Sequence, residues 1–125
     1  MDLTQGNVFS VFYFRQPSGN EPVKDWIRSF DKDDRKLIGE DIETAQLRWP
    51  CAMPIVKKID TDLWEIRSTI SHNQRARIFV TVFDRNIVLL HGFIKKTSKI
   101  PLSDLNLAKR RRDLVQRDNH EQVYR

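Results

Sequence analysis

The sequence is poor in cysteine and glycine and has no long apolar run. The single cysteine, Cys51, cannot form a disulfide within the chain, so we expect a reducing compartment, the cytoplasm. No apolar stretch approaches the roughly 20 residues of a membrane-spanning helix, and the N-terminus lacks the basic start and apolar core of a signal peptide. With four glycines and five prolines among 125 residues, collagen-like and linker-like compositions are excluded. We therefore expect a cytoplasmic protein that does not bind membranes.

Positive charge exceeds negative charge in a chain that has enough apolar residues to form a core. Lys and Arg number 22 and Asp and Glu 17, which gives a net charge of +5 and a pI near 9.6. Apolar residues make up 39% of the chain and include seven Phe and three Trp. This composition predicts one folded domain over residues 1–115, followed by a polar tail at 116–125. The basic balance favours nucleic acid as a partner only modestly, because many ordinary soluble domains share it.

Two hydrophobic periods predict consecutive helices in the first half of the chain. Apolar residues recur at helical spacing over 23–30 and again over 37–49, and Asp31 is a suitable N-cap for the second helix. A third helix is expected to begin near Pro101 or Ser103. We expect the first two helices to form a helical hairpin that lies on a sheet.

The strands are predicted from β-branched and aromatic runs. Residues 8–14 are apolar on both faces, which favours a central strand, and residues 87–94 are nearly all apolar and predict another central strand. A strand over 56–68, bent or interrupted at 60–62, and one over 76–83 alternate between apolar and polar residues. The predicted fold class is therefore α+β, with a mostly antiparallel sheet, helices on one side of it and a C-terminal helix.

Charged side chains alternate with apolar ones along the predicted strands. The residues concerned are Lys57, Lys58, Glu65, Arg67, Arg75 and Arg77, followed by Lys95, Lys96 and Lys99. Residues two apart on a strand share a face and neighbouring strands lie about 4.8 Å apart, so these cations could gather within roughly 10 Å of one another. Such a cluster suits a phosphodiester backbone. The alternative is that they are solvated residues of ordinary half-exposed strands, with Glu65 and Arg67 as a simple ion pair.

The remaining polar residues of interest are histidines and a run of cations. His91 stands inside an apolar strand, so it is either a hydrogen-bonded structural residue or a general acid or base. The four cations of 109–112 spread around a helix and indicate a solvated surface, with contact to nucleic acid or a partner as the alternative. His72, His91 and His120 are scattered and Cys51 has no partner at ligand spacing, so no metal site is predicted. Without a glycine-rich phosphate loop, no cofactor is predicted either.

Three segments carry a resemblance to a known superfamily. They read LWEIR over 63–67, RIF over 77–79 and IVLLHGFIKKTSKIP over 87–101. In this order they resemble the RelE/ParE toxins of type II toxin–antitoxin systems, and most closely their HigB-like, phage-related branch. The resemblance implies a compact RelE-like fold with a mostly antiparallel sheet, two N-terminal helices and a C-terminal helix. It also implies a toxin, since many members are endoribonucleases that cut messenger RNA in the ribosomal A site and the ParE branch inhibits DNA gyrase.

Residue by residue, the resemblance implies a set of candidate site residues. The catalytic candidates are Arg67, Arg77, Lys96, His91 and Glu65, and the RNA-binding candidates are Lys57, Lys58, Lys95, Lys99 and Arg75. The two arginines would bind phosphate, Lys96 would neutralise the leaving-group side, and His91 or Glu65 would accept a proton. The chain departs from RelE itself at two points, because Glu65 replaces a lysine and no residue matches the C-terminal tyrosine, Tyr124 lying too far along the chain.

The implied partners and alternatives follow from the same resemblance. The RNA supplies its own 2′-OH nucleophile, so the expected cleavage needs no metal. The expected partners are messenger RNA, the ribosome, a cognate antitoxin of the helix-turn-helix type and, through that complex, operator DNA. The alternatives are a ParE-like gyrase inhibitor and a catalytically decayed homologue that binds only its antitoxin.

Overall fold

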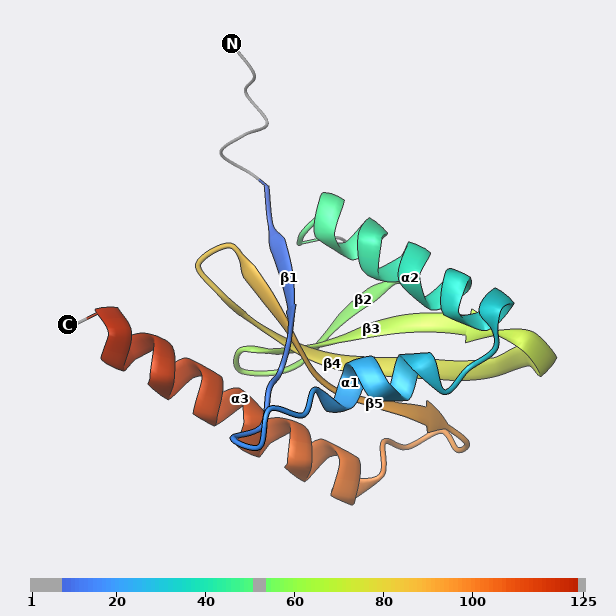
Figure 1. The fold of residues 1–125 in the computed structure, drawn as a ribbon. Coiled ribbons are helices and arrows are strands. Elements are labelled where there is room, and N and C mark those ends of the chain that lie inside the picture. Colours follow the sequence, from blue (N-terminus) through green and yellow to red (C-terminus); the bar gives the residue numbers. More distant parts are fainter. Residues whose placement is uncertain (1–7, 51–53, 124–125) are drawn as a thin grey trace, which may run out of the picture.

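The fold is α+β, as predicted, and is built on one five-stranded sheet (Figure 1). The computed structural model describes residues 8–50 and 54–123, so Cys51 and Tyr124 lie outside the described residues. In chain order the elements are β1 (Ser10–Tyr13), α1 (Pro22–Arg28), α2 (Lys32–Leu47), β2 (Val56–Asp60), β3 (Leu63–Ile70), a 3₁₀ turn (Ser71–Asn73), β4 (Gln74–Phe83), β5 (Asn86–Lys95) and α3 (Leu102–Val123).

The sheet is mixed, with the strand order β1-β5-β4-β3-β2. The pairs β2–β3, β3–β4 and β4–β5 are antiparallel, whereas β1 runs parallel to β5. The central position predicted for 87–94 is confirmed, because β5 lies between β1 and β4. The central position predicted for 8–14 is wrong, because β1 is an edge strand and leaves Phe12 about half exposed.

Two separate hydrophobic clusters cover the two faces of the sheet. The first contains Val23 of α1 and Ile38 of α2, packed against Ile78 and Leu89 of the sheet. The second contains Ala108 of α3, together with the buried residues Phe14, Leu63, Phe79, Leu90 and Phe93. Figure 1 shows α3 on the side of the sheet opposite to α1 and α2. The prediction that the helices gather on one side is therefore wrong, because alternate strand residues are apolar on both faces and each face requires its own cover.

The second N-terminal helix begins with the predicted N-cap residue, but the two helices do not clearly pack against each other as a hairpin. Asp31 caps α2, since its carboxylate accepts a hydrogen bond from the Asp34 backbone N–H at 2.9 Å. The two helices are consecutive, but α1 packs mainly on β5 and α2 mainly on β3. A helical hairpin is thus not clearly formed, because each helix buries its apolar stripe against the sheet.

The segment predicted as a strand bent or interrupted at 60–62 is interrupted there and forms two antiparallel strands. Asp62 adopts φ 51°, a left-handed conformation that lets the chain reverse between β2 and β3. Aspartate tolerates this conformation better than most residues. The turn therefore divides this segment into β2 and β3. The period-two pattern alone did not separate these two strands.

Gly92 of β5 allows the closest approach between a helix and the sheet. A Cβ atom at this position would lie 2.3 Å from Cε3 of Trp26 on α1. The indole therefore lies directly on the glycine backbone, where no other residue would fit without displacing it. This contact gives a structural reason for the glycine in the HGF segment.

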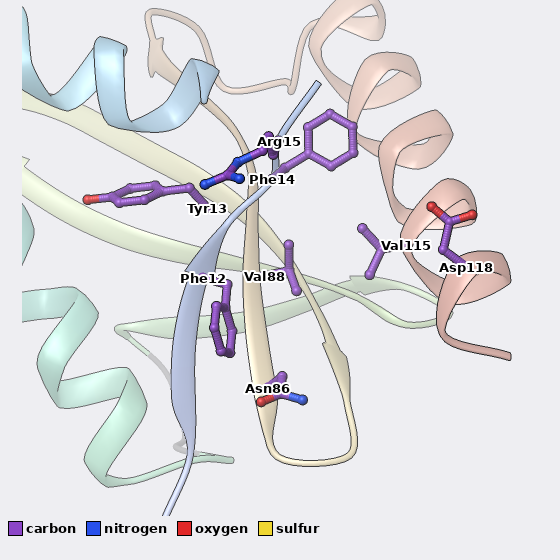
Figure 2. A pocket seen from close by; sticks show the side chains of 8 residues that line it. All are labelled: Phe12, Tyr13, Phe14, Arg15, Asn86, Val88, Val115 and Asp118. Carbon is purple, nitrogen blue, oxygen red and sulfur yellow. The ribbon is translucent and has the colours of Figure 1, made fainter. Parts of the chain in front are cut away.

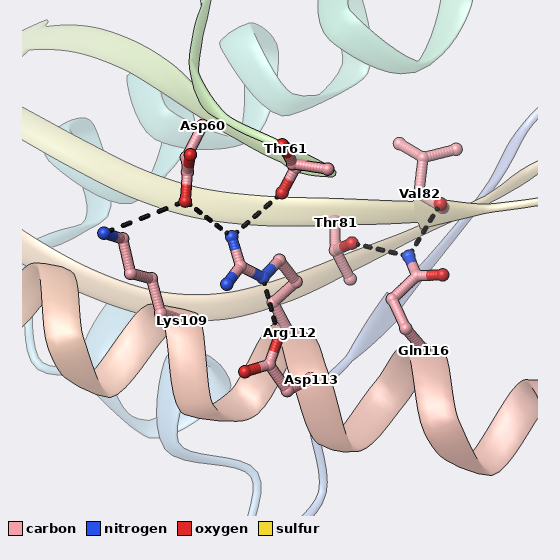
Figure 3. Close-up of polar contacts among 8 residues, drawn as sticks. All are labelled: Asp60, Thr61, Thr81, Val82, Lys109, Arg112, Asp113 and Gln116. Atoms are coloured by element: carbon pink, nitrogen blue, oxygen red, sulfur yellow. Dashed lines mark hydrogen bonds and ion pairs between the residues drawn. The ribbon is translucent and has the colours of Figure 1, made fainter.

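Polar side chains hold α3 against the sheet (Figure 3). The guanidinium of Arg112 donates from Nη1 to Asp60 Oδ2 and to the Thr61 carbonyl, both at 2.9 Å. Gln116 donates from Nε2 to Thr81 Oγ1 at 2.9 Å, within the segment predicted as a polar tail. The helix continues through that segment to Val123.

The cations of 109–112 do not all form a solvated surface, contrary to the prediction, and only Arg110 of the four is exposed. Arg111 is 9% exposed and donates from Nη1 to the Leu90 carbonyl at 2.7 Å, while its guanidinium lies 5.1 Å from the centre of the Phe14 ring. Lys109 and Arg112 both contact Asp60 (Figure 3). Three of the four cations therefore join α3 to the sheet, because one side of this helix faces strands that offer oxygen acceptors.

Candidate functional site

Five charged residues gather on the face of β3, β4 and β5 that also carries Phe79 and Phe93. We name them the cationic cluster: Glu65, Arg67, Arg75, Arg77 and Lys95. Arg67 and Arg77 are directly opposite each other in the β3–β4 register, and Arg75 is opposite Lys95 in the β4–β5 register. Alternation along each strand places all five on one side of the sheet.

The cluster is organised around the carboxylate of Glu65. Its Oε1 lies 3.5 Å from Nε of Arg67 and 3.7 Å from Nε of Arg77. Glu65 is 1% exposed and Arg77 is 5% exposed, so both form the floor of the cluster. Arg77 also donates from Nη1 to the Ala76 carbonyl at 3.0 Å. The floor is therefore a buried ion pair rather than a solvated one.

Positive charge in the cluster exceeds what one carboxylate can neutralise. Burial lowers the pKa of Arg77; Glu65 opposes this effect, and Arg67 and Arg75 lower the pKa further. The pKa of Lys95 is also lowered, first by burial and then by the charges of the three arginines, again against Glu65. An added anion would relieve this repulsion, which is the electrostatic condition for binding phosphate.

Two buried atoms of the cluster lack hydrogen bonds. Neither Oε2 of Glu65 nor Nε of Arg77 has a hydrogen-bond partner among residues 8–50 and 54–123. Unsatisfied buried polar atoms are rare in folded proteins and often mark functional positions. The floor of the cluster is therefore not optimised for stability alone.

The outer part of the cluster is accessible. The Arg67 side chain is 25% exposed, and Arg75 and Lys95 are half-buried. A pocket of about 530 Å³ opens beside Arg67 and Arg77. Its other lining residues are Leu37, Asp41, Pro54, Ile55 and Thr69. Arg67 is therefore the cation of the cluster that is both partly exposed and part of the pocket lining.

The other predicted lysines differ in whether they share the face of the cationic cluster. Lys57 is directly opposite Glu65 in the β2–β3 register and is exposed on the same face. Lys58 points to the other face, where its Nζ lies 5.6 Å from the centre of the Trp64 ring. Lys96 and Lys99 are exposed in the segment after β5. The structure thus brings Lys95, rather than Lys96, onto the face of Arg67 and Arg77.

His91 lies on the same face of β5 but is engaged elsewhere. Its Nε2 lies 2.6 Å from Oδ1 of Asp104 in the first turn of α3. Its ring stacks on Phe93, with centroids 6.0 Å apart and planes 11° apart. In the register Phe79 separates His91 from Glu65, so the two predicted proton acceptors do not meet. Asp104 was not among the predicted site residues, because its only signal in the sequence is an acidic residue shortly after Pro101.

A second groove lies at the other end of the sheet, between β1, β5 and α3 (Figure 2). It has a volume of about 450 Å³. Phe12, Val88 and Val115 line it, with Arg15 and Asp118 among the charged residues at its border. None of the predicted site residues lines this groove, so it is separate from the cationic cluster.

The described residues contain no group of three or more His, Cys, Asp or Glu side chains arranged to hold a metal ion. In the same part of the chain, no helix is both long enough and apolar enough to cross a lipid bilayer.

Comparison with known proteins identifies the family but no individual relative. No curated protein matches the chain. The model of one family, described as phage derived protein Gp49-like (DUF891), matches residues 25–113, which include all five residues of the cationic cluster. Since this match covers most of the chain, the protein belongs to the Gp49-like family, a family of RelE/HigB-like toxins of toxin–antitoxin systems.

Proposed function

We propose that this toxin is an endoribonuclease that cleaves messenger RNA on the ribosome by attack of the RNA's own 2′-OH. The cationic cluster carries the proposal, because it offers more positive charge than Glu65 neutralises and leaves three cations open to a phosphate. Membership of a family of toxins supports a cellular target of this kind.

The burial pattern divides the cluster into two roles. Arg67, Arg75 and Lys95 are accessible and would contact the scissile phosphate and its neighbours. Arg77 lies beneath them and would stabilise the negative charge of the phosphorane from below. Guanidinium groups suit this task because they stay charged and bind phosphate oxygens in pairs. Lys57, Lys58, Lys96 and Lys99 would contact RNA further from the reacting bond.

The role of Glu65 follows from its burial. At 1% exposure, and with both arginines beside it, its carboxylate holds Arg67 and Arg77 in place. It would position these cations rather than take up a proton from RNA. His91 is then the proton acceptor among the predicted residues.

One observation favours a second candidate function, inhibition of DNA gyrase by binding alone. Both predicted proton acceptors are engaged inside the protein, Glu65 with two arginines and His91 with Asp104. A surface that only binds an acidic partner needs no free acid or base. In that case the cationic cluster would contact the target without cleaving it.

Primer extension on messenger RNA after induction of the toxin separates the two functions. The expected result is a set of discrete cuts within translated codons. Arg67→Ala should reduce the cleavage rate by about 100- to 1000-fold, since each preorganised charge contact contributes roughly 3–4 kcal/mol to transition-state stabilisation. Arg85→Ala is the matched control, because Arg85 is exposed in the turn at the opposite end of the β4–β5 hairpin.

Each outcome of this experiment has one meaning. Cuts that disappear in Arg67→Ala but persist in Arg85→Ala support the ribonuclease. A DNA-damage response without cuts supports gyrase inhibition, and the absence of any growth effect supports a decayed homologue. Cleavage by purified toxin on washed ribosomes should also survive removal of metals other than the magnesium that ribosomes need; loss of cleavage under those conditions would contradict the metal-independent mechanism.

The partners belong to the same proposal. Family membership suggests a cognate antitoxin. We expect an acidic or amphipathic segment of a helix-turn-helix antitoxin to cover the cationic cluster, and the complex to bind operator DNA. Copurification of the toxin with the product of the neighbouring gene tests this expectation.

A further inference from the structure

We propose that His91 and Asp104 form a general-base dyad for RNA cleavage, in which Asp104 positions the His91 ring. This inference rests on the ribonuclease function proposed above. It assigns a role to Asp104, which the sequence analysis did not single out, and it names the ring nitrogen of His91 that takes the proton.

Contacts with Asp104 and Phe93 fix both the position and the orientation of the His91 ring. Nε2 of His91 lies 2.6 Å from Oδ1 of Asp104, a short contact that joins β5 to the first turn of α3. The ring also stacks on Phe93, which in turn stacks on Phe79 with centroids 5.2 Å apart. The two side chains of the dyad are only 18% and 23% exposed. The imidazole therefore needs little reorganisation before it can react.

The contact determines which nitrogen is free. An ionised carboxylate can only accept hydrogen bonds, so Nε2 of His91 must carry the proton and donate it to Asp104. Nδ1 is then an unprotonated acceptor, and no side chain or backbone group of residues 8–50 and 54–118 is its hydrogen-bond partner. This is the arrangement of a base ready to accept a proton.

The dyad lies on the same face as the cationic cluster. His91, Phe93 and Lys95 alternate along β5, and Phe93 is the register partner of Arg77. His91 and Arg77 are therefore diagonal neighbours, with Cα atoms about 7–8 Å apart. His91 lies four residues from Lys95 on β5, so RNA held by the outer cations would have to extend along this strand to bring a 2′-OH to the dyad.

The reaction needs one proton transfer at each end of the phosphate. The 2′-OH gives its proton to Nδ1 of His91 while its oxygen bonds to phosphorus. The bond between phosphorus and the 5′ oxygen breaks, and that oxygen takes a proton from water. The imidazolium then returns its proton to the solvent, so the products are a 2′,3′-cyclic phosphate and a 5′-hydroxyl end. Asp104 stabilises the imidazolium in between.

The first test measures single-turnover cleavage of messenger RNA bound in a programmed ribosome. His91→Ala should lower the rate by on the order of 100-fold or more, with partial recovery on adding imidazole. Asp104→Asn should lower it by at least about 10-fold with unchanged affinity for the ribosome. Asp113→Asn is the matched control, since Asp113 also lies on α3 but is 69% exposed and contacts Arg112.

The second test does not depend on activity. Nitrogen NMR of the wild-type protein, with the His91 signals assigned by their loss in His91→Gln, should show a proton on Nε2 and none on Nδ1. Asp104→Asn should mix the two tautomers.

The outcomes separate this inference from the proposed function. If the wild type cleaves RNA and folded Asp104→Asn cleaves at the wild-type rate, the dyad is wrong and the ribonuclease stands. A proton on Nδ1 in the wild type, or a loss confined to ribosome affinity, also overturns the dyad. If the wild type cuts no RNA at all, the proposed function fails first and the dyad has no reaction to serve.

Discussion

Two groups of cations in this protein differ in how their charges are balanced. On α3, Arg111 donates to a backbone carbonyl and Arg112 contacts Asp60 and Thr61, so these side chains are matched by oxygen acceptors. On the sheet, the cationic cluster holds four cations around one carboxylate, and two of its buried atoms have no hydrogen-bond partner in the part of the chain that the structure describes. Cations that are matched inside the protein hold the fold together. Cations that outnumber their acidic partners leave positive charge that an external anion can neutralise. In this protein such charge lies on the sheet, where a bound phosphate would neutralise it.

The largest expected effect comes from removing the single carboxylate of the cluster. Glu65→Gln leaves Arg77, which is 5% exposed, without its counter-charge. Breaking a buried ion pair in this way costs about 3–5 kcal/mol of unfolding free energy. Urea denaturation of Glu65→Gln and of the wild type measures the difference. A variant as stable as the wild type would show that Glu65 does not balance the cluster.

The next effect separates two adjacent lysines. Lys95 shares the face of Arg67 and Arg77, whereas Lys96 is exposed after the end of β5. We expect Lys95→Ala to reduce the cleavage rate by about 100-fold, since it removes a charge near the phosphate. Lys96→Ala should have a much smaller effect and serves as the matched control. Equal rates in both variants would place the phosphate elsewhere than in the cationic cluster.

A smaller effect is expected from a matched cation of α3. Arg111→Met keeps much of the side-chain volume but leaves the Leu90 carbonyl without its donor. The expected loss is about 1–3 kcal/mol of unfolding free energy with unchanged cleavage by the protein that stays folded. Thermal unfolding and the cleavage assay, run side by side, test both parts. If Arg111→Met lost cleavage but kept its stability, the cations of α3 would serve the reaction and not only the fold.

The smallest effect is expected at Asp60, the carboxylate that Lys109 and Arg112 of α3 contact. The hydrogen bond from Arg112 holds the pKa of Asp60 below its ordinary value of 3.8. Because the folded-state pKa is depressed, the stabilisation is present above the unfolded-state pKa and is lost as pH falls through the folded-state pKa. Asp60→Asn should therefore be slightly less stable than the wild type at neutral pH, and the two should converge in acid below about pH 3.8. A constant difference across acidic pH would show that Asp60 does not act through its charge.

Much of the secondary structure could be predicted because local signals were strong. Asp31 before a helical period predicted the start of α2, and the apolar run over 87–94 predicted a central β5. Groups of site residues on one strand could also be predicted. Alternation places Glu65 on the same face as Arg67, and Arg75 on the same face as Arg77. The proposed reaction followed from the resemblance and stays a proposal.

Other features depended on contacts between distant segments. The edge position of β1 was not predictable from its apolar composition, because a strand does not show which neighbour it pairs with. Asp104 was missed because its partner His91 lies in another element, 13 residues earlier. Lys95 and Lys96 are chemically identical, and only the register of β5 against β4 separates them.

The amino-acid order alone determined which segments form helices and strands, since periodicity and capping act within a few residues. It also determined that cations occur on β2, β3, β4 and β5 and on the last helix. Tertiary structure decided which of those cations meet an oxygen acceptor, because strand pairing and helix docking bring the partners together. The physical reason is that a charge acts over a few ångströms of space, and that distance is set by the fold and not by position along the chain.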